Sequence, residues 1–249
     1  TEYERVANEA ETPEDRADAL AVAGDLHEDA GNFRQALEVL AILVTEYTDP
    51  LERLVVTRFK MATLHGKLDE ASERKDALRN VVALDAQAGS ERTPRVRRLA
   101  AKAALELTEP SFEAYASLEL KQPFERSLAR KQRKLKQVLS EFESLVDYGV
   151  GEVTAAATYY IAEAYGEFGR ALIHSERPTD LSGSDRLDYE DILEEQAYPF
   201  EERTIKVHEK NLDLARTRVA NQWVERSLSR LAALSPGRYA KQEASTGPI

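Results

Sequence analysis

The spacing of apolar residues in the long stretches between prolines is the feature that most constrains the fold. Within 128–146, Leu128, Leu135, Leu139 and Phe142 follow one another at intervals of seven, four and three residues, which keeps one stripe of a helix apolar. No segment shows the sustained alternation of apolar and polar residues that a half-buried strand requires. The sequence therefore predicts an all-α fold of about nine or ten helices.

The longest stretch without glycine or proline lies between Pro199 and Pro236. Its apolar stripe consists of Ile205, Leu212, Ala215, Val219 and Trp223. We expect one long helix over 200–234, or two nearly collinear ones, reaching about 54 Å at 1.5 Å per residue. Because proline removes a helical hydrogen bond, we also expect Pro110 and Pro199 to separate shorter helices from one another.

Residues 17–50 have the pattern of a helical hairpin. The small residues Gly24 and Ala36 would let two helices cross closely, and Gly31 would supply the turn because it adopts a positive φ without strain. Apolar side chains that would fill the seam belong to Leu20, Leu40 and Leu43. At about 34 residues, this segment resembles a tetratricopeptide repeat (TPR), although His27 and Ala23 replace the residues usual there.

Residues 51–88 resemble a second, degenerate repeat. Gly66 precedes the small residue Ala71 by five positions, and Asp69 is a candidate N-cap for the helix that follows. The resemblance implies an α-α superhelix, or solenoid, with irregular long helices towards its C-terminal end. We expect TPR-like hairpins over 1–93 and a continuous degenerate repeat region over 94–240. The tail, 241–249, is expected to be disordered.

A wider resemblance covers roughly 100–240. The segments that carry it are 100–107 (AAKAALEL), 122–124, 146–154, 161–165, 170–178, 193–202 (LEEQAYPFEE) and Trp223-Val224. They are similar to the C-terminal region of large bacterial TPR proteins associated with TonB/ExbB-like or gliding-motility machinery of the cell envelope. The resemblance implies a periplasmic scaffold without catalytic residues, and a chain that is the end of a longer protein.

The residue types needed for most catalytic and metal centres are missing or poorly spaced. Without cysteine there is no thiolate nucleophile and no cysteine-based metal site. Of the histidines, only His65 has an acidic residue, Asp69, at the helical spacing of a shared metal ion. The Gly149–Thr154 segment lacks the third glycine of a dinucleotide loop. We therefore expect no metal, no cofactor and no enzymatic activity.

Charge is concentrated in two bands. Residues 121–136 hold seven Lys or Arg against one Glu, and residues 185–202 hold eight Asp or Glu against one Arg. The bands are either solvated helix faces, which could neutralise each other, or surfaces that steer a charged partner such as an acidic protein or an anionic lipid. Candidate partner-binding residues in the basic band are Arg130, Lys131, Arg133 and Lys134.

Two further groups are candidates for partner binding. Tyr159 and Tyr160 belong to an aromatic group on one predicted helix, where core packing is the alternative role. In the clear repeat, the first helix would line a concave surface and present an acidic strip that includes Asp18, Asp25 and Glu28. Such a strip would favour a basic peptide, unless it is simply solvated.

The expected function is a non-catalytic protein–protein interaction scaffold of the bacterial envelope, binding its partner through a concave TPR-like surface. One alternative is a periplasmic module that binds peptidoglycan or another glycan, and another is the capping end of a longer solenoid. The net charge of −11 disfavours nucleic-acid binding. No apolar run reaches the roughly 20 residues of a transmembrane helix.

Overall fold

The computed structural model describes residues 2–216 and 221–240, and these residues form α-helices without strands, which confirms the all-α class. The helices of the first half are α1 (Glu2–Glu9), α2 (Pro13–Asp29), α3 (Phe33–Glu46), α4 (Leu51–Lys67), α5 (Ala71–Gln87) and α6 (Pro94–Ala116), with a 3₁₀ turn, η1 (Gly89–Glu91). Those of the second half are α7 (Phe124–Val146), α8 (Gly151–Ile173), α9 (Gly183–Arg216), α10 (Gln222–Leu234) and α11 (Pro236–Tyr239).

The chain divides into two compact units, residues 1–107 and 108–249, and the division falls within α6. We refer to them as unit 1 and unit 2 and describe each by itself. No described helix is both long enough and apolar enough to cross a membrane. The predicted solenoid stays a prediction.

In unit 1, α2 and α3 form the hairpin that the sequence predicts. Gly31 turns the chain with φ of 75°, and Gly24 lies so close to α3 that a Cβ added there would be 2.7 Å from Leu40 Cδ2. The seam residues Leu20, Leu40 and Leu43 are buried in one apolar cluster together with Ala36. Close helix approach at a glycine therefore organises this part of the core.

The second hairpin, α4 with α5, differs from its prediction at the turn. Asp69 is not the N-cap of α5, because its backbone adopts a φ of 58° within the turn and α5 begins at Ala71 after Glu70. Gly66 lies inside α4, one residue before the helix ends. His65 Nδ1 lies 2.8 Å from a carboxylate oxygen of Glu70, so that ring is used to close the turn.

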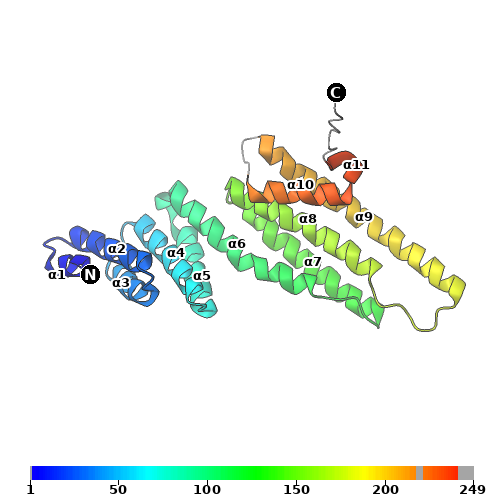
Figure 1. The fold of residues 1–249 in the computed structure, drawn as a ribbon, viewed down its shortest axis with the longest axis horizontal. Helices are drawn as coiled ribbons and strands as arrows, with labels where there is room; N and C mark the ends of the chain where they lie inside the picture. The colour runs from blue at the N-terminus through cyan, green and yellow to red at the C-terminus, as the bar shows by residue number, and fades with distance from the viewer. Residues whose placement is uncertain (1, 217–220, 241–249) are drawn as a thin grey trace, which may run out of the picture. The chain divides into compact units, whose positions relative to one another are not determined.

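In unit 2, α8 is the central helix (Figure 1). Helices α7, α9 and α10 all pack against it, and Tyr115 of α6 donates a hydrogen bond to the Ala164 carbonyl at 2.8 Å. Alanines and glycines dominate the buried positions of α8, among them Ala155, Ala156, Ala157 and Gly169. Small side chains on several faces allow neighbouring helices to approach it from several directions.

The expectation of one long or two collinear helices over 200–234 is wrong. Helix α9 ends at Arg216, and α10 folds back to pack on α9 and α8 (Figure 1). Asn221 is the N-cap of α10, and its side chain accepts hydrogen bonds from the backbone N–H groups of Trp223 and Val224. Val219 of the predicted stripe and the tail 241–249 lie outside the described residues.

Two prolines that were expected to end helices lie inside them. Helix α6 continues through Pro110, and α9 continues through Pro199. On α9, the buried residues Leu193, Ala197 and Thr204 keep the same face towards α8 on both sides of the proline. Packing along that face outweighs the one helical hydrogen bond that a proline removes.

Candidate functional site

The acidic strip predicted on α2 is offset by cations of α4. Its carboxylates belong to Asp18, Asp25 and Glu28. Each forms at least one ion pair, and the cations are Arg53, Lys60 and Lys67. Hydrogen bonds from Lys67 and Lys60 hold the pKa of Glu28 below its ordinary value. A basic peptide would have to compete with these internal cations for the strip.

The basic band lies on α7, and the structure separates its members. Arg130 and Arg133 are exposed, whereas Lys134 is half-buried and donates to the Gln137 side chain at 3.1 Å. Lys131 is only 1% exposed, so the prediction that it contacts a partner is wrong. Its Nζ donates to the Leu118 carbonyl at 2.6 Å and lies 3.2 Å from a carboxylate oxygen of Glu167.

Lys131 is buried because it lies on the apolar stripe of α7. The buried residues of this stripe are Lys131, Leu135, Val138, Phe142 and Leu145. Burial lowers the pKa of Lys131 although Glu167 acts in the opposite direction. The carbonyl of Leu118, the carboxylate of Glu167 and the ring of Tyr115, 5.0 Å from Nζ, compensate for the lost hydration.

The exposed side of α7 contributes to a groove of about 610 Å³. The α6–α7 connection forms one wall, and the first turns of α7 form the other. Its charged lining residues are Glu119, Lys121, Arg126, Arg130 and Arg133. Lys121 pairs with Glu119 at 2.6 Å. The three arginines form no ion pair with any residue that the structure describes, and we call this the cationic groove.

Tyr159 and Tyr160 are half-buried in an aromatic cluster rather than presented on an open surface. Tyr160 stacks on Phe142 with ring centroids 4.8 Å apart, and both tyrosines contact the indole ring of Trp223. The hydroxyl of Tyr160 donates to Glu109 at 3.1 Å, and burial raises the pKa of this hydroxyl. These aromatic faces pack chiefly against one another.

A stripe of charged residues runs along one face of α8. Its members are Glu163, Glu167, Arg170 and His174, at intervals of four, three and four residues. Arg230 of α10 donates to Glu163 at 2.6 Å, and Arg170 donates to Glu167 at 3.1 Å. Burial by itself would raise the pKa of Glu163, but hydrogen bonds from His208 and Arg230 outweigh burial and hold it below its ordinary value.

The same network brings a serine, a histidine and a carboxylate into contact. His208 Nε2 lies 3.2 Å from Glu163 Oε1, and His208 Nδ1 lies 3.1 Å from Ser227 Oγ. Nucleophilic catalysis uses such an order of groups. Here His208 and Ser227 are fully buried, and Asn211 donates to the Ser227 hydroxyl at 2.8 Å. The contacts therefore join α8, α9 and α10 and leave no approach for a substrate to this serine.

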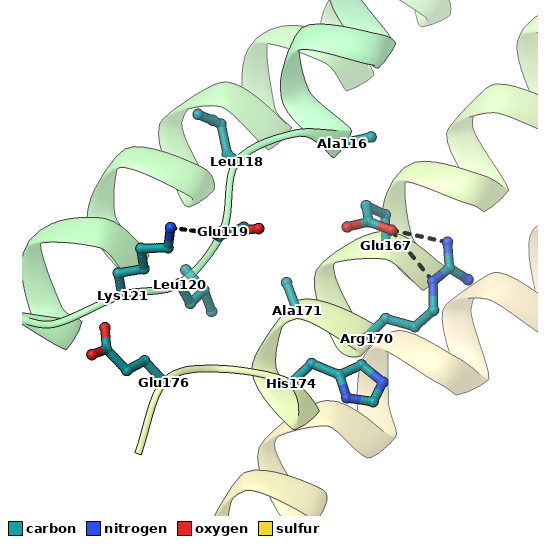
Figure 2. Close-up of a pocket in the computed structure, with 10 residues that line it drawn as sticks. All are labelled: Ala116, Leu118, Glu119, Leu120, Lys121, Glu167, Arg170, Ala171, His174 and Glu176. Carbon is teal, nitrogen blue, oxygen red and sulfur yellow. Dashed lines mark hydrogen bonds and ion pairs between the residues drawn. The ribbon is translucent and has the colours of Figure 1, made fainter. Parts of the chain in front are cut away.

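Two clefts flank the C-terminal turns of α8. Figure 2 shows the first, of about 750 Å³, with Arg170 and His174 projecting from α8 opposite Glu119 and Lys121. The second, of about 610 Å³, lies among α8, α9 and α10 and also includes Arg170 and His174. In the first cleft Lys121 pairs with Glu119 and Arg170 with Glu167, so most of its charge is compensated internally.

The N-terminal half of α9 exposes an uncommon combination of side chains. Leu187 is 64% exposed, Ile192 54% and Tyr198 60%. Carboxylates on the same outward side belong to Asp188, Asp191 and Glu195, and none of them forms an ion pair with a described residue. We call these six residues the acidic–apolar face of α9. Helix α8 lies between α7 and α9, and no ion pair joins the basic band to this face among the described residues.

No family model and no curated protein matches the chain. A solved structure described as "Computational Design of Self-Assembling Cyclic Protein Homooligomers" is similar at 15% identity, covering 94% of this chain and 87% of that one, with a TM-score of 0.31. That likeness is too weak to bear on fold or function. The resemblances to TPR proteins and to envelope TPR proteins stay predictions.

Sequence reasoning missed the charged stripe of α8 and the acidic–apolar face of α9. The stripe has a detectable signal, because carboxylates at 163 and 167 recur at helical spacing in a helix that is otherwise rich in alanine. The α9 face also has one, because Leu187 and Ile192 lie inside the acidic band. The sequence does not show which side of α9 packs on α8 and which side faces outward.

Proposed function

We propose that this chain is a non-catalytic binding module whose unit 2 docks a basic, amphipathic segment of a partner protein on the acidic–apolar face of α9. The observation that carries the proposal is the exposure of Leu187, Ile192 and Tyr198 on one side of a single helix. Full burial of a leucine or isoleucine is worth about 1.5–3 kcal/mol, so a partner that covers this face gains substantially. Tyrosine adds a large contact area with a polar tip.

The charge of this face determines the chemistry of the partner. Asp188, Asp191 and Glu195 are uncompensated within the described part of the chain, and they lie among the apolar side chains. Lysine or arginine side chains on the partner would neutralise them, and long-range attraction would accelerate the encounter. A basic helix with leucine-like residues on one face meets both requirements.

A second copy of the chain could offer its cationic groove to this face, but the groove would match the face less well than a basic, amphipathic segment does. The outward residues of α7 near the groove are polar and charged, including Arg126, Arg130, Arg133 and Gln137. Val146, an exposed apolar residue of α7, lies at the opposite end of the helix from the groove. A separate partner protein is therefore the better occupant. By the resemblance of 100–240 to envelope TPR proteins, we place that partner in the bacterial cell envelope and this chain in the periplasm.

The packing of Tyr159 and Tyr160 leaves these two tyrosines unsuited to binding a glycan. Sugar binding commonly uses an open aromatic face, whereas Tyr159 and Tyr160 pack against Phe142, Trp223 and each other. The acidic strip of α2 is a weaker candidate for a binding surface than the α9 face, because internal cations offset its carboxylates.

A direct test uses fluorescence anisotropy with the full-length chain and a synthetic helical peptide that carries Lys and Leu on one face. We expect binding that weakens as salt increases. Replacing the three apolar residues of the α9 face by serine should weaken binding about tenfold or more. The control replaces three other exposed apolar residues by serine, namely Val6, Leu26 and Ile42 of unit 1, which are 41–42% exposed.

Two results would contradict the proposal. One is equal binding of a peptide of the same charge in which serine replaces leucine, because charge alone would then explain the affinity. The other is equal weakening by the control substitutions. The envelope assignment has its own test, which is cross-linking in intact cells through a photoreactive residue at position 192. A cross-link to a cytosolic protein alone would contradict that assignment without affecting the α9 face.

A further inference from the structure

We propose that the cationic groove at the start of α7 is a binding site for a phosphate-bearing anion. This inference does not rest on the proposed function, because α8 separates the α7 side of unit 2 from the acidic–apolar face of α9. The groove measures about 610 Å³, which is in the size range of small-molecule sites. Its distinguishing property is uncompensated positive charge in a concave surface.

Three guanidinium groups supply that charge. Arg126, Arg130 and Arg133 are spaced by four and three residues on α7, so they lie on one face of the helix about one turn apart. None forms an ion pair with a described residue, although the chain as a whole is acidic. Three unpaired arginines beside a groove retain their hydrogen-bond donors for a ligand.

The opposite wall is held in place by its own hydrogen bonds. The buried Lys131 donates to the Leu118 carbonyl at 2.6 Å, and Ser127 Oγ donates to the Lys121 carbonyl at 2.7 Å. The Gln122 backbone N–H donates to Glu176 at 2.8 Å. These contacts tie the α6–α7 connection to α7 and to the segment after α8. A preorganised wall reduces the entropy that ligand binding must overcome.

The donor set favours phosphate over carboxylate. A guanidinium group binds phosphate through paired N–H donors, and one phosphate has enough oxygens to engage more than one such fork. A single carboxylate has two oxygens and one charge, so it satisfies one arginine and leaves two uncompensated. The start of α7 adds positive potential from the helix dipole at the same end of the groove.

Isothermal titration of the full-length chain with inorganic pyrophosphate tests the proposal. We expect binding by the wild type and a loss of about tenfold or more in affinity for the triple variant Arg126→Gln, Arg130→Gln, Arg133→Gln. The control variant carries Lys75→Gln, Arg97→Gln and Arg98→Gln, which remove the same charge from exposed, unpaired positions of unit 1. It should bind pyrophosphate within about twofold of the wild type.

A conservative variant separates geometry from charge. Arg130→Lys keeps the positive charge and removes the fork, so it should weaken pyrophosphate binding while its circular dichroism melting curve remains that of the wild type. Succinate, a dianion without phosphate, should bind clearly more weakly than pyrophosphate. The α9-face serine variant should bind pyrophosphate as the wild type does, which keeps this test independent of the proposed function.

Two sources of the phosphate group are distinguished by a second arm with vesicles. Sedimentation with vesicles containing phosphatidylinositol 4-phosphate, competed by pyrophosphate and lost in the triple variant, identifies a lipid headgroup. Pyrophosphate binding without sedimentation identifies a soluble anion. The proposal is overturned if the wild type does not bind pyrophosphate, if succinate binds equally well, or if the control variant weakens binding as much as the triple variant.

Discussion

Arg130 and Lys131 are neighbours in the sequence, yet their environments are opposite. Arg130 lines the cationic groove, whereas Lys131 is buried and bonded to Leu118 and Glu167. A rotation of about 100° per residue along a helix is enough to move a side chain from solvent to core. At the scale of residues, the position on the helix decides whether a charge is available to a partner or holds the fold together.

The charge of Glu163 gives a pH-dependent prediction at this scale. The pKa of Glu163 in the folded protein lies below its ordinary value of 4.5. Its carboxylate therefore stabilises the fold above that ordinary value, and the contribution is lost as the pH falls through the folded pKa. We expect Glu163→Gln to lower the free energy of unfolding by about 1–3 kcal/mol near neutral pH.

Urea unfolding at a series of pH values provides the measurement. The difference between wild type and Glu163→Gln should shrink as the pH falls below 4.5, because the wild-type side chain then becomes neutral as well. Glu195→Gln is the control, since Glu195 is exposed, and it should change stability by less than about 0.5 kcal/mol. A difference that is independent of pH would show that Glu163 acts only through packing.

At the scale of helices, two glycine substitutions can separate the effect of the close α2–α3 crossing on stability from the effect of helix propensity. Gly24 and Gly66 both lie inside helices, so replacing either by alanine should favour the helix by about 1 kcal/mol. At Gly24 the new Cβ would meet Leu40 Cδ2 at 2.7 Å, whereas at Gly66 the nearest side-chain atom is 3.4 Å away in Arg74.

We therefore expect Gly66→Ala to stabilise the protein and Gly24→Ala to be less stable than Gly66→Ala by about 1–3 kcal/mol, the usual cost of overpacking. Chemical denaturation followed by circular dichroism measures both. Combining Gly24→Ala with Leu40→Ala tests the cause, because the shorter side chain removes the clash and the two effects should then be non-additive. Equal stabilities of the two glycine variants would contradict a close crossing at Gly24.

At the scale of the whole molecule, each unit has its own buried core, and the single tryptophan reports on one of them. Trp223 lies in the aromatic cluster of unit 2, while Leu64 is fully buried in the core of unit 1. Leu64→Ala should cost unit 1 about 2–5 kcal/mol. We expect it to shift part of the circular dichroism transition and to leave the transition in tryptophan fluorescence unchanged.

Phe142→Ala is the reciprocal variant. Phe142 is fully buried in unit 2 and stacks on Tyr160, which in turn contacts Trp223. This substitution should therefore lower the midpoint of the fluorescence transition. If Leu64→Ala shifts the fluorescence midpoint by the same amount as the circular dichroism midpoint, the two units unfold as one cooperative body instead. The outcome separates two independent cores from one folding unit.

The sequence by itself determined the helical class, the turn at Gly31 and the crossing at Gly24, because periodicity and backbone preferences act over a few residues. Only the tertiary structure decided that α9 continues through Pro199, that α10 folds back and that Lys131 is buried. It also decided which charges are compensated, as for Asp25 by Lys60, and which remain available, as in the cationic groove. These features depend on which helix packs beside which, and the residues that meet there lie tens of positions apart in the chain.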